Sequence, residues 1–513
     1  MPELREVYAS YLLVKTFFQK HIHASWKVEG IWADGTDKEA NNAPGSSRVA
    51  QGHVYELEPT HKVKRGCRKS QNSVWPPKFG SKPGTPADLS VVTALRLESV
   101  HTTARALVLN FGAMFLSLQY LTHTAPQFYT KDVWTDSICN VTKTVRGFRV
   151  AVAFAFKDYV LSFNSIDLVF HPTWALKRED LPHQHIDVVD NYMMFLLGVA
   201  YWVIENMAKS RKRLAVLAIR QANLVWPGVG SYTISEIFFL AGLSTSLTEK
   251  ELVDSPSRLA RLCEALYEYA VLSRENIWEF IRPAIRGGML APTQAQRVAY
   301  ADWLFVFAKE RVWVSKRMTS LLQNYQKKIA EYAQNLDIPW QLAGANLHDV
   351  FEPTFLARTL KRAGNLGHLI FGRTEWTTMV DRYNRNFPAD QHILVSAGED
   401  PLTKMFRERG LLDKETSLAT EIYAPIFLSD REMKGSWQRT RMFYSEKQLW
   451  TLTPDLPTNC EGRSTSKMYE ITGVERTDSL FQSIIDTNRV SIGPLEYCGN
   501  GVAVKRQARG ENM

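Results

Sequence analysis

Hydrophobic and polar positions follow a helical period at the start of the chain. The spacing of the apolar residues predicts an amphipathic helix over residues 1–22; they are Tyr8, Tyr11, Leu12, Val14, Phe17 and Phe18. Residues 27–87 then lose all periodicity and are punctuated by Gly, Pro, Ser and Asn. A loop of this length is typical of a binding arm or a disordered segment. We therefore expect a flexible arm after the first helix.

Beyond the arm the pattern changes twice. Ser90 can cap a long helix through residues 91–121. Residues 145–170 instead place large apolar side chains at every second position from Phe148 to Phe156, which predicts a hairpin turning near Lys157. From 188 to 345 nearly every segment has a helical period, including a stripe over residues 314–329. After about residue 346 the elements shorten, and short strands are expected after 420.

These patterns together predict a mainly α fold, a large multi-helix protein with a minor β component. The β component is the hairpin near 145–170 and the short strands after 420. Composition and periodicity divide the chain into four parts: an N-terminal helix and basic flexible arm (1–87), a helical core lobe (88–345), a smaller mixed C-terminal lobe (346–498) and a mobile basic tail (499–513).

Composition adds a preference among partners. The 513 residues include 62 Lys and Arg against 53 Asp and Glu, a net charge of +9, which favours polyanions such as nucleic acid. The five cysteines contain no CxxC pair, so they predict no zinc knuckle and fit a reducing compartment. The apolar run Tyr192–Ile204 is shorter than the roughly 20 residues of a membrane span. It predicts a buried helix, and no signal peptide precedes it.

Motifs that would identify an enzyme are missing from the sequence. It contains no GxxxxGK[ST] phosphate loop, HExxH or GxSxG pattern, so no catalytic residue and no cofactor is predicted. His171, His183 and His185 are weak metal candidates, since H-x-H places two imidazoles on one face of a strand. The alternative for these histidines is a polar loop without a metal.

Residues 226–242, "WPGVGSYTISEIFFLAG", resemble a helix-hairpin-helix element. Pro227, Gly228, Val229, Gly230 and Thr233 fit the order of that motif. In that family the motif holds the nucleic-acid backbone without reading sequence, and Gly228 and Gly230 would let the backbone approach a phosphate. The alternative is an ordinary helix connection in which Thr233 and Glu236 form a capping box.

Four basic segments, 61–84, 209–220, 372–387 and 434–450, extend this prediction, and all but 209–220 include aromatic residues, such as Trp75, Trp376 and Tyr383. Lysine and arginine neutralise phosphates, and aromatic rings stack on unpaired bases. Together with the two turn glycines, the predicted nucleic-acid-binding residues are Lys62, Lys64, Arg65, Arg68, Lys69, Trp75, Lys209, Arg211, Lys212, Arg213, Arg373, Arg382, Arg385, Arg439 and Arg441. The alternative for each segment is a solvated surface beside a core aromatic.

The sequence therefore favours a non-enzymatic protein that binds RNA, single-stranded and without sequence specificity, and assembles with copies of itself. Viral nucleoproteins and capsid proteins share this design, which is an analogy and not a family match. Such a protein would be intracellular, in the cytoplasm or nucleus, or part of a virion. The alternatives are an enzyme with an unrecognised, metal-dependent site around His171, His183 and His185, and a membrane-surface protein using residues 209–213.

Overall fold

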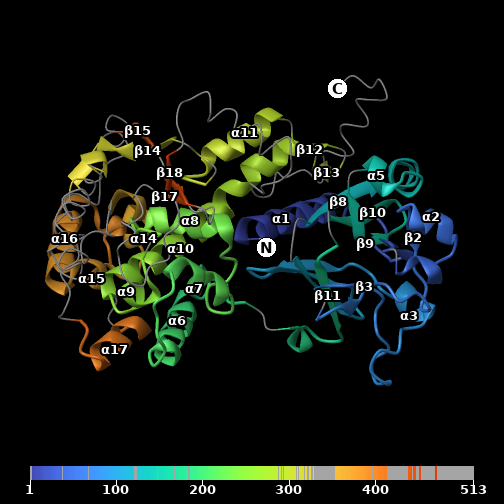
Figure 1. Cartoon of the computed structure of the whole chain (residues 1–513), viewed down its shortest axis with the longest axis horizontal. Coiled ribbons are helices and arrows are strands. Elements are labelled where there is room, and N and C mark those ends of the chain that lie inside the picture. The colour runs from blue at the N-terminus through green and yellow to red at the C-terminus, as the bar shows by residue number, and fades with distance from the viewer. Residues whose placement is uncertain are drawn as a thin grey trace. The chain divides into compact units, whose positions relative to one another are not determined.

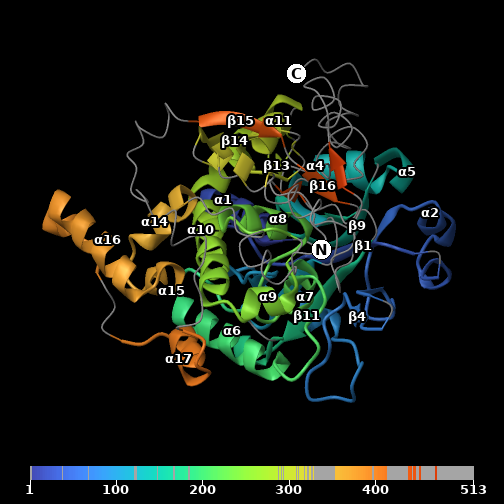
Figure 2. The same ribbon diagram turned by 60° about the vertical axis from the view of Figure 1, so that its left-hand side comes forward.

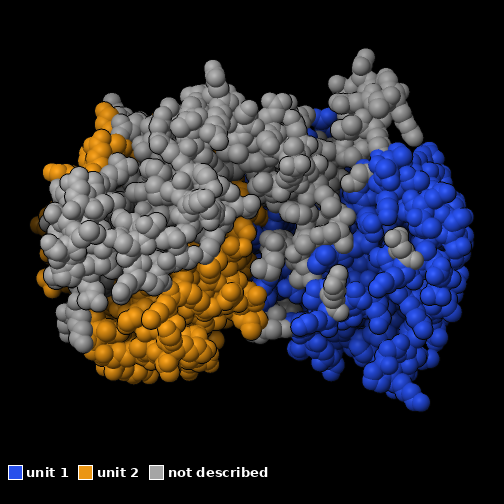
Figure 3. Space-filling view, in the orientation of Figure 1, with its two compact units in different colours: residues 1–185, 273–300, 484–513 blue, residues 186–272, 301–483 orange. Residues whose placement is uncertain are grey.

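The computed structural model describes residues 3–327 and 353–412 with short gaps, together with residues 437–441, 443–445, 450–451 and 468–470. The chain falls into two compact units, which Figure 3 colours separately. Unit 1 comprises residues 1–185, 273–300 and 484–513, and unit 2 comprises residues 186–272 and 301–483. The four-part division expected from composition stays a prediction, and its tail, 499–513, lies outside the described residues.

The first sheet of unit 1 has five antiparallel strands in the order β2-β1-β9-β10-β8. Their bounds are Gly30–Asp34 (β1), Val54–Glu56 (β2), Thr124–Thr130 (β8), Arg149–Ala155 (β9) and Tyr159–Ser165 (β10). β9 and β10 form the hairpin predicted between residues 145 and 170. Both faces of this hairpin are covered, because Phe154 and Leu161 lie in one core cluster while Val150 and Val160 lie in another.

The second sheet of unit 1 has four antiparallel strands in the order β11-β7-β6-β5. Their bounds are Ser99–Thr102 (β5), Ala106–Asn110 (β6), Phe115–Tyr120 (β7) and Phe170–Ala175 (β11). Leu107 and Leu116 of this sheet share the core cluster of Phe154 and Leu161, so the two sheets enclose one core. The predicted first helix is α1 (Leu4–Lys20), labelled in Figure 1. Its Val7 and Val14 belong to the same core cluster.

The expected mainly α fold is wrong, because unit 1 is built on these two sheets. The segment predicted as a long helix after Ser90 is α3 (Leu89–Thr93) followed by β5, β6 and β7. Leucines at every second position of β6 and β7 point into the core, and Gly112 turns the chain between these strands with φ +74°. Leucine and alanine favour helices intrinsically, but tertiary packing overrides that preference here.

Residues 27–87, expected as a flexible arm, contribute to the core of unit 1. Val63, Val74 and Trp75 are almost fully buried there.

The short elements of unit 1 are η1 (Ala40–Asn42), α2 (Ser46–Ala50), β3 (Lys64–Arg65), β4 (Asn72–Ser73), α4 (Lys131–Trp134), η2 (Thr135–Cys139), α5 (Lys143–Arg146), η3 (Arg178–Asp180), η4 (Arg282–Ala284), β12 (Ile285–Arg286) and β13 (Met289–Leu290).

A buried ion pair joins distant segments of unit 1. Arg146 donates from Nη2 to both carboxylate oxygens of Asp34 at 2.8 Å, and both side chains are 1% exposed. The same carboxylate accepts the N–H of Val150 at 2.7 Å. Arg146 also donates to the carbonyl oxygens of Ile138 and Gly52. The pair therefore ties β1 to β9 and to the helices that cover the first sheet.

Unit 2 is mainly helical, and its helices are labelled in Figures 1 and 2. The helices are α6 (Tyr192–Asn206), α7 (Ala215–Gln221), α8 (Ser231–Leu240), α9 (Glu249–Val253), α10 (Pro256–Ile281), α11 (Gln294–Trp303), η5 (Pro353–Leu356), α14 (Ala357–Leu360), α15 (Gly367–Phe371), α16 (Arg373–Asn386), η6 (Ala389–Gln391) and α17 (Pro401–Glu408). The last residues of α10 and most of α11 belong to unit 1. The apolar run around residue 200 is α6, and no helix among the described residues combines the length and apolar composition of a membrane crossing.

One buried carboxylate organises the helices of unit 2. Glu264 of α10 is fully buried and accepts hydrogen bonds from Arg362 at 3.0 Å, the Leu366 N–H at 2.8 Å and the Tyr192 hydroxyl at 3.0 Å. Burial raises the pKa of the Glu264 carboxyl, whereas Arg362 and the hydrogen-bond donors favour its ionised form. The Arg362 guanidinium also lies 3.9 Å from the centroid of the Tyr192 ring. Glu264 therefore fixes α6 and α10 to the segment around α14 and α15.

We predict that Glu264→Gln lowers the free energy of unfolding by about 3 kcal/mol, because Arg362 would keep its charge without a charged partner. Denaturant unfolding measures this change. Glu205→Gln, an exposed acid on α6, is the matched control and should change stability by less than about 0.5 kcal/mol. Equal effects of the two substitutions would contradict the role of Glu264.

Candidate nucleic-acid interface

The predicted helix-hairpin-helix sequence forms a tight turn between α7 and α8. The Val229 N–H donates to the Trp226 carbonyl at 3.5 Å, which closes a four-residue turn. Pro227 occupies its second position and Gly228, with φ +71°, its third, as a type II turn requires. Gly230 then caps the N-terminus of α8. The turn is anchored by the fully buried Trp226, which packs edge-on against Phe195.

The turn leaves backbone donors unsatisfied. The N–H groups of Gly228 and Gly230 have no hydrogen-bond partner in the described part of the chain, although both residues are buried. Arg220 of α7 donates to the Ser231 hydroxyl at 2.9 Å, which places a guanidinium beside the start of α8. Unpaired amides at a helix N-terminus favour an anion, because they carry partial positive charge. Because residues 226–230 are buried, however, the turn does not expose these amides to a nucleic-acid phosphate in this structure.

Glu236 of α8 has a different role from the capping box considered for it. Its fully buried carboxylate accepts the N–H groups of Phe305, Val306 and Phe307 at 2.8, 2.7 and 2.8 Å. Thr233 donates to the Tyr269 hydroxyl at 3.1 Å. One side chain of α8 therefore holds three consecutive residues that precede the first strand of unit 2.

That strand, β14 (Arg311–Ser315), pairs with β15 (Trp437–Arg441) in a two-stranded antiparallel ribbon, visible in Figures 1 and 2. The long helix predicted after Pro292, which would include the apolar stripe over 314–329, is thus interrupted by this strand. Arg439 lies opposite Trp313, and Arg441 lies opposite Arg311. Since residues at alternate positions share a face, these four positions fall on one side of the ribbon.

The two faces of the ribbon differ in exposure. Val312 and Val314 are 1% and 0% exposed, whereas Trp313 between them is 58% exposed. The ribbon therefore exposes an indole at a position that shares its face with three arginine positions. This face of the ribbon has the residue types that contact phosphates and stack on bases.

Residues 209–213 split into different roles. Arg211 is 8% exposed and pairs with Asp254 at 2.5 Å, and Arg213 pairs with Glu249 at 2.6 Å. Lys209 donates to the Asn206 side chain at 2.8 Å, and Lys212 is exposed. The ion pair with Asp254 makes the Arg211 guanidinium unavailable to a ligand. Lys209 and Lys212 are therefore the cations of this group that are most accessible to solvent.

The three arginines of α16 lie on its solvent side. Arg373, Arg382 and Arg385 are exposed, while Trp376 and Tyr383 face the core with 2% and 6% exposure. At 100° per residue, Arg382 and Arg385 lie on neighbouring faces and Arg373 at the helix start lies on another. The helix therefore presents separate charges and buries the aromatic rings predicted to stack on bases.

In unit 1, the predicted residues of the segment 61–84 also differ from one another in exposure. Lys62, Lys64 and Lys69 are exposed. Arg65 is 1% exposed and donates to Glu39 at 3.3 Å and to backbone carbonyls, so its guanidinium has an internal role. Trp75 is 2% exposed and donates to the Ala87 carbonyl at 2.8 Å. Arg68 lies outside the described residues.

The histidine candidates do not assemble a metal site among the described residues. No group of three His, Cys, Asp or Glu side chains that could hold a metal occurs there, and His183 lies outside the described part. His171 of β11 is half-buried, and burial lowers the pKa of its imidazole. Within the described structure this histidine therefore has the environment of a packed side chain.

Sequence reasoning missed Trp313 and offered Glu236 only as a capping-box residue, and each had a signal. Trp313 stands between two valines, an alternation typical of a strand with one exposed face. Glu236 is the one acid in an otherwise apolar and small-residue helix, residues 231–242. A lone acid in such a helix indicates a buried hydrogen-bond acceptor.

Comparison with known proteins gives weak similarity only. No family model matches the chain, and no curated protein matches its sequence. The Lactococcus lactis Fpg (MutM) in complex with DNA containing N7-benzyl-Fapy-dG is 14% identical with a TM-score of 0.34, covering 60% of this chain and 89% of that chain. The same enzyme with DNA containing an abasic site is 13% identical with a TM-score of 0.34, covering 60% and 88%. Scores at this level assign neither fold nor function.

We predict that Glu236→Gln loosens the ribbon, because an amide nitrogen cannot accept the Phe305 N–H. Hydrogen exchange of residues 305–315 should become faster, corresponding to about 1–3 kcal/mol of lost local protection. Glu251→Gln on the neighbouring α9, which disturbs a capping box, is the control and should leave exchange in 305–315 unchanged. Unchanged exchange in the Glu236 variant would contradict its positioning role.

Proposed function

We propose that the protein binds nucleic acid through unit 2, with the β14–β15 ribbon contacting the nucleic-acid backbone. The observation that carries this proposal is the 58% exposure of Trp313 on a face that also holds Arg311, Arg439 and Arg441. A two-stranded ribbon fits a nucleic-acid groove, arginine neutralises phosphates, and an exposed indole stacks on or inserts beside a base.

The burial of the other aromatic residues bears on the type of polymer. Trp75, Trp376 and Tyr383, which the sequence offered as stacking platforms, are 2%, 2% and 6% exposed. Extended stacking on a single strand loses its support when these rings are internal. Contact with the nucleic-acid backbone does not need these rings. We therefore propose a duplex as the ligand, with duplex DNA as the first ligand to test. Single-stranded RNA, with self-assembly of a nucleoprotein, is the alternative proposal that the composition supports.

A binding assay separates these proposals. Fluorescence anisotropy would compare labelled duplex DNA, duplex RNA, single-stranded DNA and single-stranded RNA of equal length with the full-length protein. Duplex preference, with log affinity falling linearly with log salt concentration, is the expected result. Preference for single-stranded RNA together with oligomers in size-exclusion chromatography would favour the nucleoprotein alternative. Absence of binding to all four would contradict both.

Within that assay, Trp313→Ala should weaken binding about 5–150-fold, the range for loss of one base–aromatic contact. Tyr201→Ala is the matched control, because Tyr201 is an exposed aromatic of unit 2 with 59% exposure on α6. The control should bind like the unchanged protein. Equal losses in the two variants, or no loss in Trp313→Ala, would remove the ribbon from the interface.

A second candidate function is removal of a damaged base from DNA. One observation in this chain favours an active site: Glu3 and Arg5, at the start of α1, are 1% and 0% exposed. Arg5 donates to the Ser273 hydroxyl at 3.0 Å, and the Glu3 N–H donates to Glu6 at 2.6 Å. Burying two ionisable groups is costly, and such groups are characteristic of active sites as well as of structural networks. The two Fpg (MutM) structures named above hold DNA with a Fapy-dG lesion or an abasic site, and such damaged DNA is the substrate to test.

The test is incubation of the full-length protein with duplex DNA containing a formamidopyrimidine lesion or an abasic site. The second candidate function predicts release of the base or cleavage of the strand. It also predicts that Glu3→Gln loses this activity at least about 100-fold while keeping its DNA affinity. Intact DNA after prolonged incubation with the unchanged protein would overturn it and leave the binding proposal standing.

A further inference from the structure

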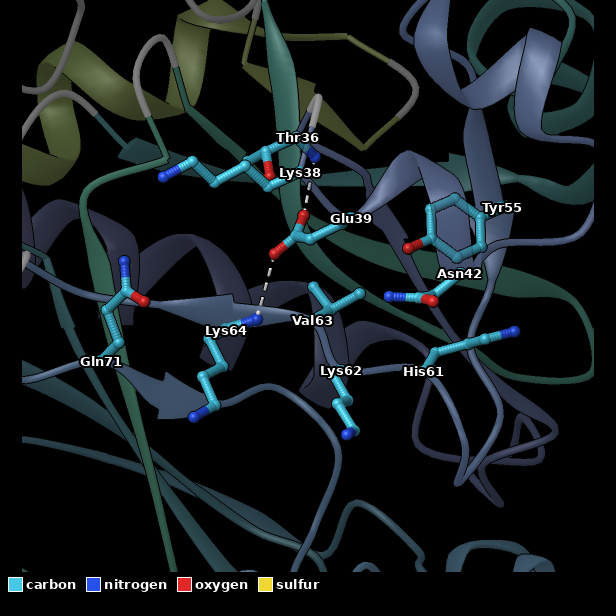
Figure 4. Close-up of a pocket in the computed structure, with 10 residues that line it drawn as sticks. All are labelled: Thr36, Lys38, Glu39, Asn42, Tyr55, His61, Lys62, Val63, Lys64 and Gln71. Carbon is cyan, nitrogen blue, oxygen red and sulfur yellow. Dashed lines mark hydrogen bonds between the residues drawn. The ribbon is translucent and has the colours of Figure 1, made fainter.

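A small polar pocket lies in unit 1, beside the first residues of the basic segment 61–84. Its volume is about 260 Å³, and Figure 4 shows the side chains that line it. Lys38 comes from the loop after β1, and Lys62 and Lys64 come from the chain at and before β3. Residues more than twenty positions apart thus bring three cations to one cavity.

The single carboxylate drawn in this pocket is already neutralised. Glu39 accepts the Thr36 N–H at 2.6 Å, the Lys64 backbone N–H at 3.2 Å and the buried Arg65 guanidinium at 3.3 Å. Figure 4 shows the first two of these bonds as dashed lines. Since Arg65 balances the charge of Glu39, the three lysines give the pocket a net positive charge.

The lysine amines have no internal partner to balance them. Among the described residues, no hydrogen bond or ion pair involves the Nζ atom of Lys38, Lys62 or Lys64. Figure 4 shows the Lys62 and Lys64 side chains extending to the same side of Glu39. Three like charges around one small cavity repel one another, and a bound anion would relieve that repulsion.

Two buried side chains add neutral hydrogen-bond donors. Tyr55 is 8% exposed, and burial, aided by the charge of Glu39, raises the pKa of its hydroxyl to about 12, so it keeps its proton at neutral pH. His61 is 7% exposed and its Nδ1 accepts the Glu58 N–H at 2.9 Å, which leaves the hydrogen of the neutral ring on Nε2. Both residues line the pocket, and Asn42 adds an amide.

We propose that this pocket is a binding site for a phosphate group, held by Lys38, Lys62 and Lys64 with hydrogen bonds from Tyr55 and His61. Its volume lies below the roughly 300–1,000 Å³ of sites that enclose a whole small molecule. It therefore suits one phosphate or pyrophosphate group, either of a small phosphorylated molecule or at the end of a nucleic-acid strand. The site lies in unit 1 and does not depend on the interface proposed for unit 2.

Calorimetric titration of the full-length protein with inorganic phosphate and with pyrophosphate tests the site. The unchanged protein should bind, with pyrophosphate tighter. The double variant Lys62→Gln/Lys64→Gln should lose about tenfold or more in affinity. Tyr55→Phe, which keeps the ring and removes the hydroxyl, should lose affinity several-fold with no loss of thermal stability.

The matched control is Lys69→Gln/Lys82→Gln, which removes two exposed lysines of the same segment that do not line the pocket. Both double variants lower the net charge from +9 to +7 (9 − 2 = 7). Affinity should fall only in the pocket variant. Equal losses in both, or no binding of either probe by the unchanged protein, would overturn the proposal.

The source of the phosphate is distinguished by oligonucleotides with a 5′-phosphate or a 5′-hydroxyl. Tighter binding of the phosphorylated strand, abolished in Lys62→Gln/Lys64→Gln, would identify a strand end as the ligand. Equal binding of the two strands, with pyrophosphate still bound, would identify a small phosphorylated molecule. Because Trp313→Ala leaves the pocket intact, its phosphate binding should be unchanged even where its nucleic-acid affinity falls.

Discussion

The account of unit 2 depends on one carboxylate and the three backbone N–H groups that it accepts. Glu236 projects from α8, five residues after its first residue, Ser231, and the 227–230 turn directly precedes that helix. Residues 305–307, which it holds, lead within a few residues into β14. A buried carboxylate without hydrogen-bond donors would be costly. We therefore expect Glu236 and residues 305–307 to take up this arrangement together. It fixes the strand that carries Trp313 to the helix that follows the glycine turn.

Buried ion pairs explain why the basic residues of the sequence do not all serve one surface. Arg146 is committed to Asp34, Arg65 to Glu39 and Arg211 to Asp254. Each guanidinium satisfies acceptors inside the fold, and removing it from water is compensated by that pairing. Net charge alone cannot separate these residues from Lys62 and Lys64, which stay exposed. The separation depends on which carboxylates folding brings into reach.

The sequence predicted local structure where a single period was clear, as in α1 and the β9–β10 hairpin. It failed over residues 94–120, where leucine and alanine resemble a helix and only long-range pairing makes strands. The turn at 227–230 was predicted because Pro-Gly fixes its own geometry. The ribbon was not, since β14 and β15 are about 120 residues apart and their register joins Trp313 to Arg439 only after folding.

Hydrogen exchange of the full-length protein with and without duplex DNA tests the central claim most directly, because a bound duplex would cover the ribbon. The account predicts slower exchange in the strands 311–315 and 437–441 when DNA is bound. Exchange along α16 should change little. Protection confined to α16 or to residues 61–84, with none in the ribbon, would contradict it.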